Sequence, residues 1–109
     1  MKITGTRTLN KVKNTLRDHK KELAKKYNIK KIGIFGSLVT GHYTKKSDID
    51  VLVDIKRNGY LRGFSYYEPL IYIQDLLHEN KIKRKVDAVF KKDLYPVYKK
   101  YILKEVVYL

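Results

Sequence analysis

Residues 33–54 read GIFGSLVTGHYTKKSDIDVLVD, and this stretch decides the fold. An apolar run ends at Gly36 and Ser37. After ten more residues, Asp48 and Asp50 open a second apolar run. Because successive side chains of a strand point to opposite faces, these two carboxylates share one face. A pair of carboxylates beside a flexible, hydroxyl-bearing turn can hold a divalent cation next to a phosphate group.

Length and composition predict one folded domain that spans residues 1–109 and has a single modest core. Hydrophobic residues make up 43% of the chain and charged residues 33%, which favours a globular over a disordered protein. There is no apolar run of membrane-spanning length, and the first residues, MKITGTRTLN, do not read as a signal peptide. The absence of Cys excludes disulfides and thiolate metal sites. We therefore expect a cytoplasmic protein.

The formal charge of +14 is unevenly distributed. Residues 1–30 carry ten Lys or Arg against two acids, and residues 55–109 carry twelve against six. The central block, residues 31–54, has three of each. A basic surround of this kind attracts polyanions such as triphosphates or RNA, or an acidic protein. The lysine-rich composition of heat-adapted proteins explains the bias equally well, and both interpretations stay open.

The first part of the chain predicts one long helix. Thr6 or Thr8 can cap its start, and Asn28 ends it. The helical spacing of its apolar residues is carried by Leu9, Val12, Leu16, Leu23 and Tyr27. His19 lies near this apolar stripe and is expected to be a partly buried structural residue.

The central stretch predicts two strands joined by a short helical turn. Residues 31–35 form the first strand, residues 38–40 the turn, and residues 49–53 the second strand. The second strand is apolar on both faces apart from its acids, so we expect it in the middle of a sheet. Residues 56–65 are polar and carry two glycines, which is typical of a surface loop that could be mobile.

The last part predicts a helix, a strand and a helix. Ser65 caps residues 66–78, with Pro69 in the first turn. Its inner side is formed by Leu70, Ile73, Leu76 and Leu77. Residues 85–90 form a third strand, and residues 95–104 form a closing helix. The predicted fold class is α/β (α+β): a two-layer sandwich of a small mixed sheet and helices.

The motif resembles that of a known family. Gly-Ser, ten residues, Asp-x-Asp and a later single Asp on a strand resemble the minimal nucleotidyltransferases of the DNA polymerase β superfamily. The local match is residues 33–54, with Ser47 directly before the acidic pair and an aliphatic run after it. The resemblance extends over most of the chain and implies the palm-like nucleotidyltransferase fold.

This resemblance also implies a chemistry. In the family, the acidic pair holds two divalent ions that bridge the triphosphate and the attacking hydroxyl. By resemblance, Asp48 and Asp50 are metal ligands, and Asp87 is the third carboxylate, which assists deprotonation of the acceptor. Two Mg²⁺ ions, which prefer oxygen ligands, are the implied cofactors, and ATP is the substrate. Gly36 lets the backbone approach the phosphates, and Ser37 can donate from its N–H and its hydroxyl.

Each acidic residue also has a structural interpretation. Asp48 could cap a turn together with Ser47. An acid inside an aliphatic strand, such as Asp50 or Asp87, is costly unless it is paired or metal-bound. Asp54 shares the parity of Asp48 and Asp50 and is a rival ligand, although a solvated or turn-forming role fits its place at the strand's end better.

Two local features narrow the interpretation. Residues 36–43 partly imitate a Walker A loop, but His and Tyr stand where Lys and Ser or Thr are required. Many members of the family carry Arg shortly after Gly-Ser, whereas residues 38–40 are Leu, Val and Thr. We therefore expect the cation that steadies the triphosphate to come from elsewhere, with Lys45, Lys46 and residues 56–62 as candidates.

The short length points to a separate acceptor. A stand-alone domain of this size resembles the MntA-like minimal nucleotidyltransferases that pair with HEPN-domain proteins in toxin–antitoxin systems. In that family, the antitoxin transfers AMP from ATP to a tyrosine of the toxin RNase. The resemblance implies protein adenylylation with a HEPN partner and no role for a membrane. Two alternatives stay open: a non-catalytic antitoxin that only binds its partner, and nucleotide addition to RNA ends.

Tyrosine is abundant, with ten residues in the chain. Two groups could form a partner-binding surface or be modified themselves: Tyr66, Tyr67 and Tyr72, and Tyr95, Tyr98, Tyr101 and Tyr108. The helical spacing of Tyr98 and Tyr101, however, favours ordinary core or half-buried packing.

Overall fold

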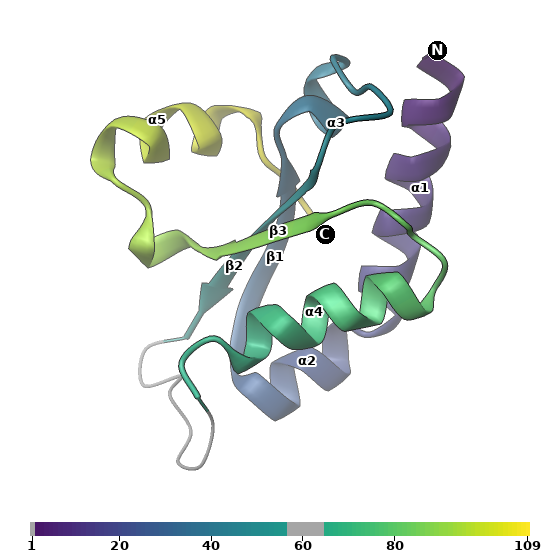
Figure 1. Cartoon of the computed structure of the whole chain (residues 1–109). Helices are drawn as coiled ribbons and strands as arrows, with labels where there is room; N and C mark the ends of the chain where they lie inside the picture. The colour runs from purple at the N-terminus through teal and green to yellow at the C-terminus, as the bar shows by residue number, and fades with distance from the viewer. Residues whose placement is uncertain (1, 57–64) are drawn as a thin grey trace.

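The computed structural model describes residues 2–56 and 65–109, with side chains described from Gly5 onward (Figure 1). The loop predicted for residues 56–65 lies almost entirely outside the described residues. The described part keeps the predicted order of the main elements, with the first helix divided in two and a short strand added after the last helix. It confirms the predicted α/β (α+β) fold class.

The sheet is mixed, as predicted. In the described residues it has four strands in the order β3-β2-β1-β4. Their bounds are β1 Ile29–Phe35, β2 Ile49–Ile55, β3 Val86–Phe90 and β4 Val107–Tyr108. β2 pairs antiparallel with β1 and parallel with β3, so its predicted place in the middle of the sheet is confirmed. β4, which pairs antiparallel with β1, was not predicted because two residues carry no recognisable periodicity.

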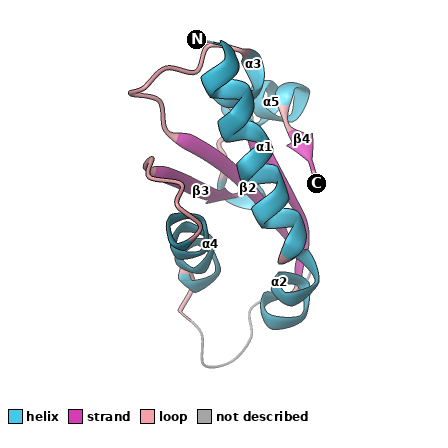
Figure 2. Cartoon of the chain, turned by 90° about the vertical axis from the view of Figure 1, so that its right-hand side faces the viewer, coloured by secondary structure: helices cyan, strands magenta, loops and turns pink. Residues whose placement is uncertain are grey.

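Helices lie on both sides of this sheet. Their bounds are α1 Lys2–Asp18, α2 Lys20–Tyr27, α3 Ser37–Thr40, α4 Glu68–Glu79 and α5 Pro96–Glu105, with a single 3₁₀ turn at Lys91–Asp93. α1, α2 and α4 cover one face, and α5 lies on the opposite side from α1 (Figures 1 and 2). No helix in the described ranges is both long enough and apolar enough to cross a membrane.

The predicted N-terminal helix differs from the structure in two ways. It begins at Lys2 rather than after a cap at Thr6 or Thr8, and it breaks into α1 and α2 at His19. His19 Nδ1 lies 2.9 Å from the carbonyl oxygen of Thr15, so the ring satisfies the backbone where the helix breaks. Its partly buried structural role is confirmed. Asn28 ends α2 in the left-handed conformation, with φ 57°.

The core forms between the sheet and the helices of its covered face. Ile49, Val51 and Val53 of β2 are fully buried there. Their packing partners include Val12, Leu16, Leu23, Ile73 and Leu77. Because strand side chains alternate, burial of these odd-numbered residues turns Asp50 and Asp54 to the opposite face. The hydrophobic pattern of β2 thus aims its acids away from the core.

The two C-terminal helices differ in burial. α4 buries Leu70, Ile73, Leu76 and Leu77, which confirms the predicted inner side, although Tyr67 rather than Ser65 occupies the cap position. α5 buries none of its residues. Tyr98 and Tyr101 are 61% and 64% exposed, so the prediction of core or half-buried packing is wrong. The spacing predicted the helix correctly, but most of its apolar side chains are exposed, and only Ile102 among them is partly buried.

Candidate active site

The three predicted acids come from two neighbouring strands. Asp48 directly precedes β2, Asp50 is the second residue of β2, and Asp87 is the second residue of β3. In the parallel pairing of β2 with β3, Asp50 stands opposite Asp87. Strand register therefore brings together two acids that lie far apart in the sequence.

The Gly-Ser turn, which follows β1, lies beside the same acids. Phe35, the last residue of β1, pairs with Asp50, so Gly36 follows directly beside that carboxylate. Gly36 has φ 79°, and a Cβ built on it would collide with Oδ2 of Asp50. Glycine is required there both for its backbone conformation and for the space it leaves. Ser37 then opens the short helix α3, which ends at Gly41 as predicted.

The electrostatics of Asp50 show how close these groups are. The pKa of Asp50 is raised to about 6, first by burial and then by the charges of Asp87, Asp48 and Glu105. In the described residues, no basic side chain forms an ion pair with Asp50. Half-burial of a carboxylate among other carboxylates is unfavourable unless a cation compensates it.

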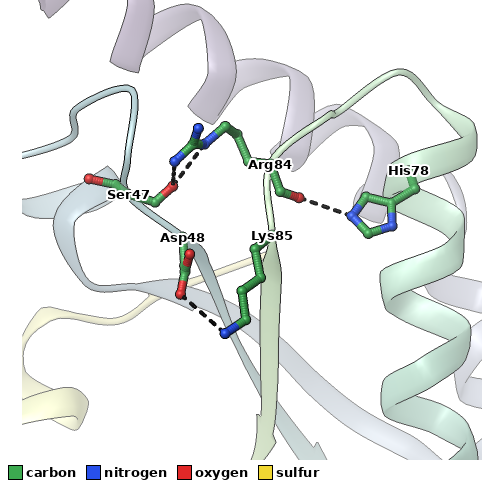
Figure 3. A network of polar contacts seen from close by, with 5 residues as sticks. All are labelled: Ser47, Asp48, His78, Arg84 and Lys85. Atoms are coloured by element: carbon green, nitrogen blue, oxygen red, sulfur yellow. Dashed lines mark hydrogen bonds and ion pairs between the residues drawn. The ribbon is translucent and has the colours of Figure 1, made fainter.

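A polar network holds the start of β2 against the start of β3 (Figure 3). Nε and Nη2 of Arg84 both donate to the carbonyl oxygen of Ser47, at 2.9 and 2.7 Å. His78 Nε2 donates to the carbonyl oxygen of Arg84 at 2.9 Å. Lys85 Nζ lies 4.0 Å from Oδ2 of Asp48. These contacts connect α4, β3 and the turn that carries Asp48.

The donor set fits a hard divalent cation, although its side chains do not yet converge. Among residues 2–56 and 65–109, no three Asp, Glu or His side chains are grouped to hold a metal ion as they stand. Asp48 lies toward Lys85, and Asp87 is exposed to solvent. Carboxylates repel one another until a cation lies between them. Mg²⁺ prefers oxygen ligands, and it would compensate the negative charge at Asp50. The assignment of Asp48, Asp50 and Asp87 as metal ligands stays a prediction.

Sequence reasoning missed a fourth carboxylate. Glu105, the last residue of α5, accepts a hydrogen bond through Oε2 from the backbone N–H of Gly36 at 2.6 Å. It is also among the charges that raise the pKa of Asp50. In the sequence, Glu105 follows Lys104 at the end of a predicted helix, where a solvated acid is the ordinary interpretation. Only tertiary structure could show that it reaches the Gly-Ser turn.

The remaining candidates lie outside this group. Asp54 forms an ion pair with Lys91 at 3.8 Å, near the far end of β2, which accounts for it without a metal. Lys45 and Lys46 are exposed in the turn before β2, and residues 57–62 are not described. Among the described basic residues, Lys85 is the one paired with a site carboxylate.

Comparisons with known proteins agree with this geometry. The family described as "Nucleotidyltransferase domain" matches residues 16–109. The chain belongs to this family. It is a nucleotidyltransferase, and the acids of β2 and β3 with the Gly-Ser turn form its candidate active site.

Relatives of this nucleotidyltransferase match it over nearly its whole length. "Putative protein adenylyltransferase MJ1379" of Methanocaldococcus jannaschii is 38% identical over 104 residues, which cover 94% of this chain and 99% of the relative. "Protein adenylyltransferase MntA" of Thermococcus cleftensis is 37% identical over 102 residues, which cover 94% of this chain and 96% of the relative.

The fold also matches a solved structure. A "putative minimal nucleotidyltransferase" superposes with a TM-score of 0.60 over 88% of this chain and 94% of the other. The two sequences are 22% identical, so this likeness shows the shared fold alone. The predicted palm-like nucleotidyltransferase fold is thereby confirmed.

Proposed function

We propose that the chain is a Mg²⁺-dependent protein adenylyltransferase that moves AMP from ATP to a tyrosine hydroxyl of a partner protein and releases pyrophosphate. The observation that carries the proposal is the placement of Asp50, half-buried beside Asp48 and Asp87 and against Gly36. The relatives named protein adenylyltransferase support the choice of acceptor class.

Each residue of the group has a proposed role. Asp48, Asp50 and Asp87 would hold two Mg²⁺ ions, which would supply positive charge to the triphosphate and lower the pKa of the attacking hydroxyl. Asp87 is the exposed member, so an acceptor can reach it, and its carboxylate takes the proton of the incoming hydroxyl. Gly36 allows close approach of the triphosphate, and Ser37 binds it through its N–H and hydroxyl.

The surface next to the site suits a protein acceptor. α5 ends at Glu105, which contacts Gly36, and most of this helix is exposed, with Lys99 and Ile102 partly buried. Its large exposed apolar residues, with the one that precedes it, are Tyr95, Val97, Tyr98, Tyr101 and Leu103. Exposed aromatic residues in one patch mark protein-binding surfaces. Lys99, Lys100 and Lys104 of the same helix favour a partner with an acidic surface.

The partner that the family resemblance favours is a HEPN-domain toxin. In this interpretation the chain is the antitoxin and acts in the cytoplasm, where ATP and Mg²⁺ are plentiful. A purely non-catalytic antitoxin is disfavoured, because Gly36, Ser37, Asp48, Asp50 and Asp87 are all present and a lost activity would not preserve this set.

One observation favours a second candidate, nucleotide addition to RNA ends. A hollow of about 180 Å³ near the start of β3 is lined by basic side chains and no acidic one. The basic residues are Arg7, Lys11, Lys81, Lys83 and Arg84. A phosphate of an RNA backbone fits such a hollow.

Transfer of label tests the two candidates together. ATP labelled at the α-phosphate is offered with Mg²⁺ to the protein encoded beside this chain and, separately, to short RNA. The proposal expects label on the protein, none from γ-labelled ATP, and none with Asp48→Asn. Label on RNA alone would contradict the protein acceptor and support nucleotide addition to RNA. Equal labelling by wild type and Asp48→Asn would contradict the active site itself.

A further inference from the structure

We infer that Glu105 is a positioning residue of the nucleotide site: its carboxylate holds the backbone N–H of Gly36 and so fixes the Gly36-Ser37 turn against Asp50. For its effect on ATP, the inference rests on the proposed function. The contact itself can be measured without any activity.

The peptide groups on either side of Gly36 are both held. Its N–H donates to Glu105 Oε2 at 2.6 Å. Its carbonyl oxygen accepts from the N–H groups of Val39 and Thr40, both at 3.1 Å, inside α3. Glycine is the residue with the most backbone freedom, so a turn that begins with it needs such restraints to stay in one conformation. Hydrogen bonds to a charged acceptor are the stronger kind.

The C-terminal segment, residues 106–109, places Glu105 there. α5 has no fully buried residue, and the segment that follows it ties its C-terminal end to β1. In β4, Val107 pairs with Ile34 and Tyr108 with Gly33. The N–H of Leu109 donates to the carbonyl oxygen of Ile32 at 2.9 Å.

Gly33 makes this docking possible. A Cβ built at Gly33 would collide with Cγ2 of Val106, the residue next to Glu105. The C-terminal segment therefore lies against β1 only because position 33 has no side chain. Gly33 admits the segment, and the segment in turn carries the carboxylate that restrains Gly36.

The charge of Glu105 has two opposing effects at this turn. Glu105 adds negative charge beside Asp50, whose pKa is already raised by burial and by two other acids. A neutral acceptor at this position would hold the Gly36 N–H without that repulsion. A carboxylate is the stronger acceptor, and it keeps the turn that meets the triphosphate in place.

A different role for the same contact predicts the opposite result. If Glu105 merely occupied a donor that the phosphates need, its removal would tighten ATP binding. If it positions the turn, its removal weakens ATP binding. The sign of the change in KM for ATP separates the two.

The experiment compares Glu105→Ala with Glu105→Gln, which keeps an acceptor oxygen. Asp18→Asn, an exposed acid at the end of α1, is the matched control for loss of one charge. We expect Glu105→Ala to raise the KM for Mg²⁺-ATP by about tenfold, with a smaller change in kcat. Glu105→Gln is expected to retain most of the wild-type affinity, and Asp18→Asn all of it. Amide exchange of Gly36, followed by NMR, is expected to accelerate in Glu105→Ala alone.

A second pair of variants keeps Glu105 in place. Gly33→Ala is expected to displace the segment and to reproduce both effects of Glu105→Ala. Adding Val106→Ala to Gly33→Ala removes the closest clash and is expected to bring the KM for Mg²⁺-ATP and the amide exchange rate of Gly36 partly back to their wild-type values. An unchanged or lowered KM in folded Glu105→Ala would overturn the inference, as would equal damage in Glu105→Gln. If the wild type transfers no AMP, the proposed function fails. The amide exchange rate of Gly36 then tests the Glu105–Gly36 hydrogen bond by itself, and an unchanged rate in Glu105→Ala overturns the inference.

Discussion

The two faces of β2 differ in the residues they carry: one face contributes to the hydrophobic core, and the other carries the acids of the candidate active site. On the covered face, Ile49, Val51 and Val53 are fully buried under α1, α2 and α4. On the opposite face, Asp50 is half-buried among carboxylates, and the nearby helix α5 buries nothing. One strand thus supplies its odd-numbered residues to the core under the helices, whereas its other face carries Asp50 and Asp54 on either side of the fully buried Leu52. Substitutions of the core residues and of the acids should therefore have separable effects on stability and on activity.

The largest effect is expected on the acidic face. Asp50→Asn keeps the shape of the side chain but removes a charged metal ligand, so AMP transfer should fall on the order of a thousandfold or more. The matched control is Asp54→Asn, which lies on the same face of β2 but is paired with Lys91. Rates within a few-fold of wild type are expected for that control. Equal losses of AMP transfer in the two variants would mean that any substitution on this face of β2 lowers activity, and that Asp50 has no specific role as a metal ligand.

The next effect belongs to the covered face. Leu77→Ala truncates a fully buried side chain of α4 and should lower the free energy of unfolding by about 2–5 kcal/mol. Tyr101→Ala on α5 removes an exposed ring and should cost less than about 0.5 kcal/mol. Urea denaturation measures both. A large loss from Tyr101→Ala would show that α5 is part of the core after all.

A smaller effect concerns the partner. Tyr98→Ser combined with Tyr101→Ser removes two rings from the exposed side of α5 and should weaken transfer to the protein acceptor by about tenfold. The KM for ATP should stay unchanged. Ile71→Ser, a 51% exposed apolar residue of α4, is the control and should leave the acceptor reaction unaffected. Unchanged acceptor kinetics in the Tyr double variant would move the docking surface elsewhere.

The smallest effect is the pH dependence of folding without metal. The pKa of Asp50 is about 6 in the folded protein, against 3.8 for an ordinary Asp side chain such as that of the unfolded chain, so the folded form binds this proton more tightly. Stability from this group is therefore full below about pH 4 and is lost as the pH rises through 6. Thermal melts in EDTA should show this decline in wild type, whereas Asp50→Asn should lack it. A parallel decline in both would assign it to other groups.

Local sequence patterns predicted which residues of the candidate site lie close together. Strand parity placed Asp48 and Asp50 on one face, and the Gly-Ser spacing put Gly36 beside them, because both depend on a hairpin that the sequence encodes nearby. Asp87 was recognisable as an acid within an aliphatic strand. Each of these predictions needed only a period of two and one turn.

Long-range packing decided what the sequence could not show. Glu105 reaches Gly36 only because the two-residue strand β4 docks on β1, and so short a strand has no periodicity to detect. The exposure of Tyr98 and Tyr101 has the same origin, since apolar spacing predicts a helix but not whether anything covers it.

Calorimetric titration of ATP, with and without Mg²⁺, decides whether the acids of β2 and β3 form a metal-dependent nucleotide site with the Gly36-Ser37 turn. Wild type and Asp54→Asn should bind ATP only when Mg²⁺ is present, and Asp50→Asn should not bind it under either condition. Binding that is independent of Mg²⁺ and identical in Asp50→Asn would contradict such a site.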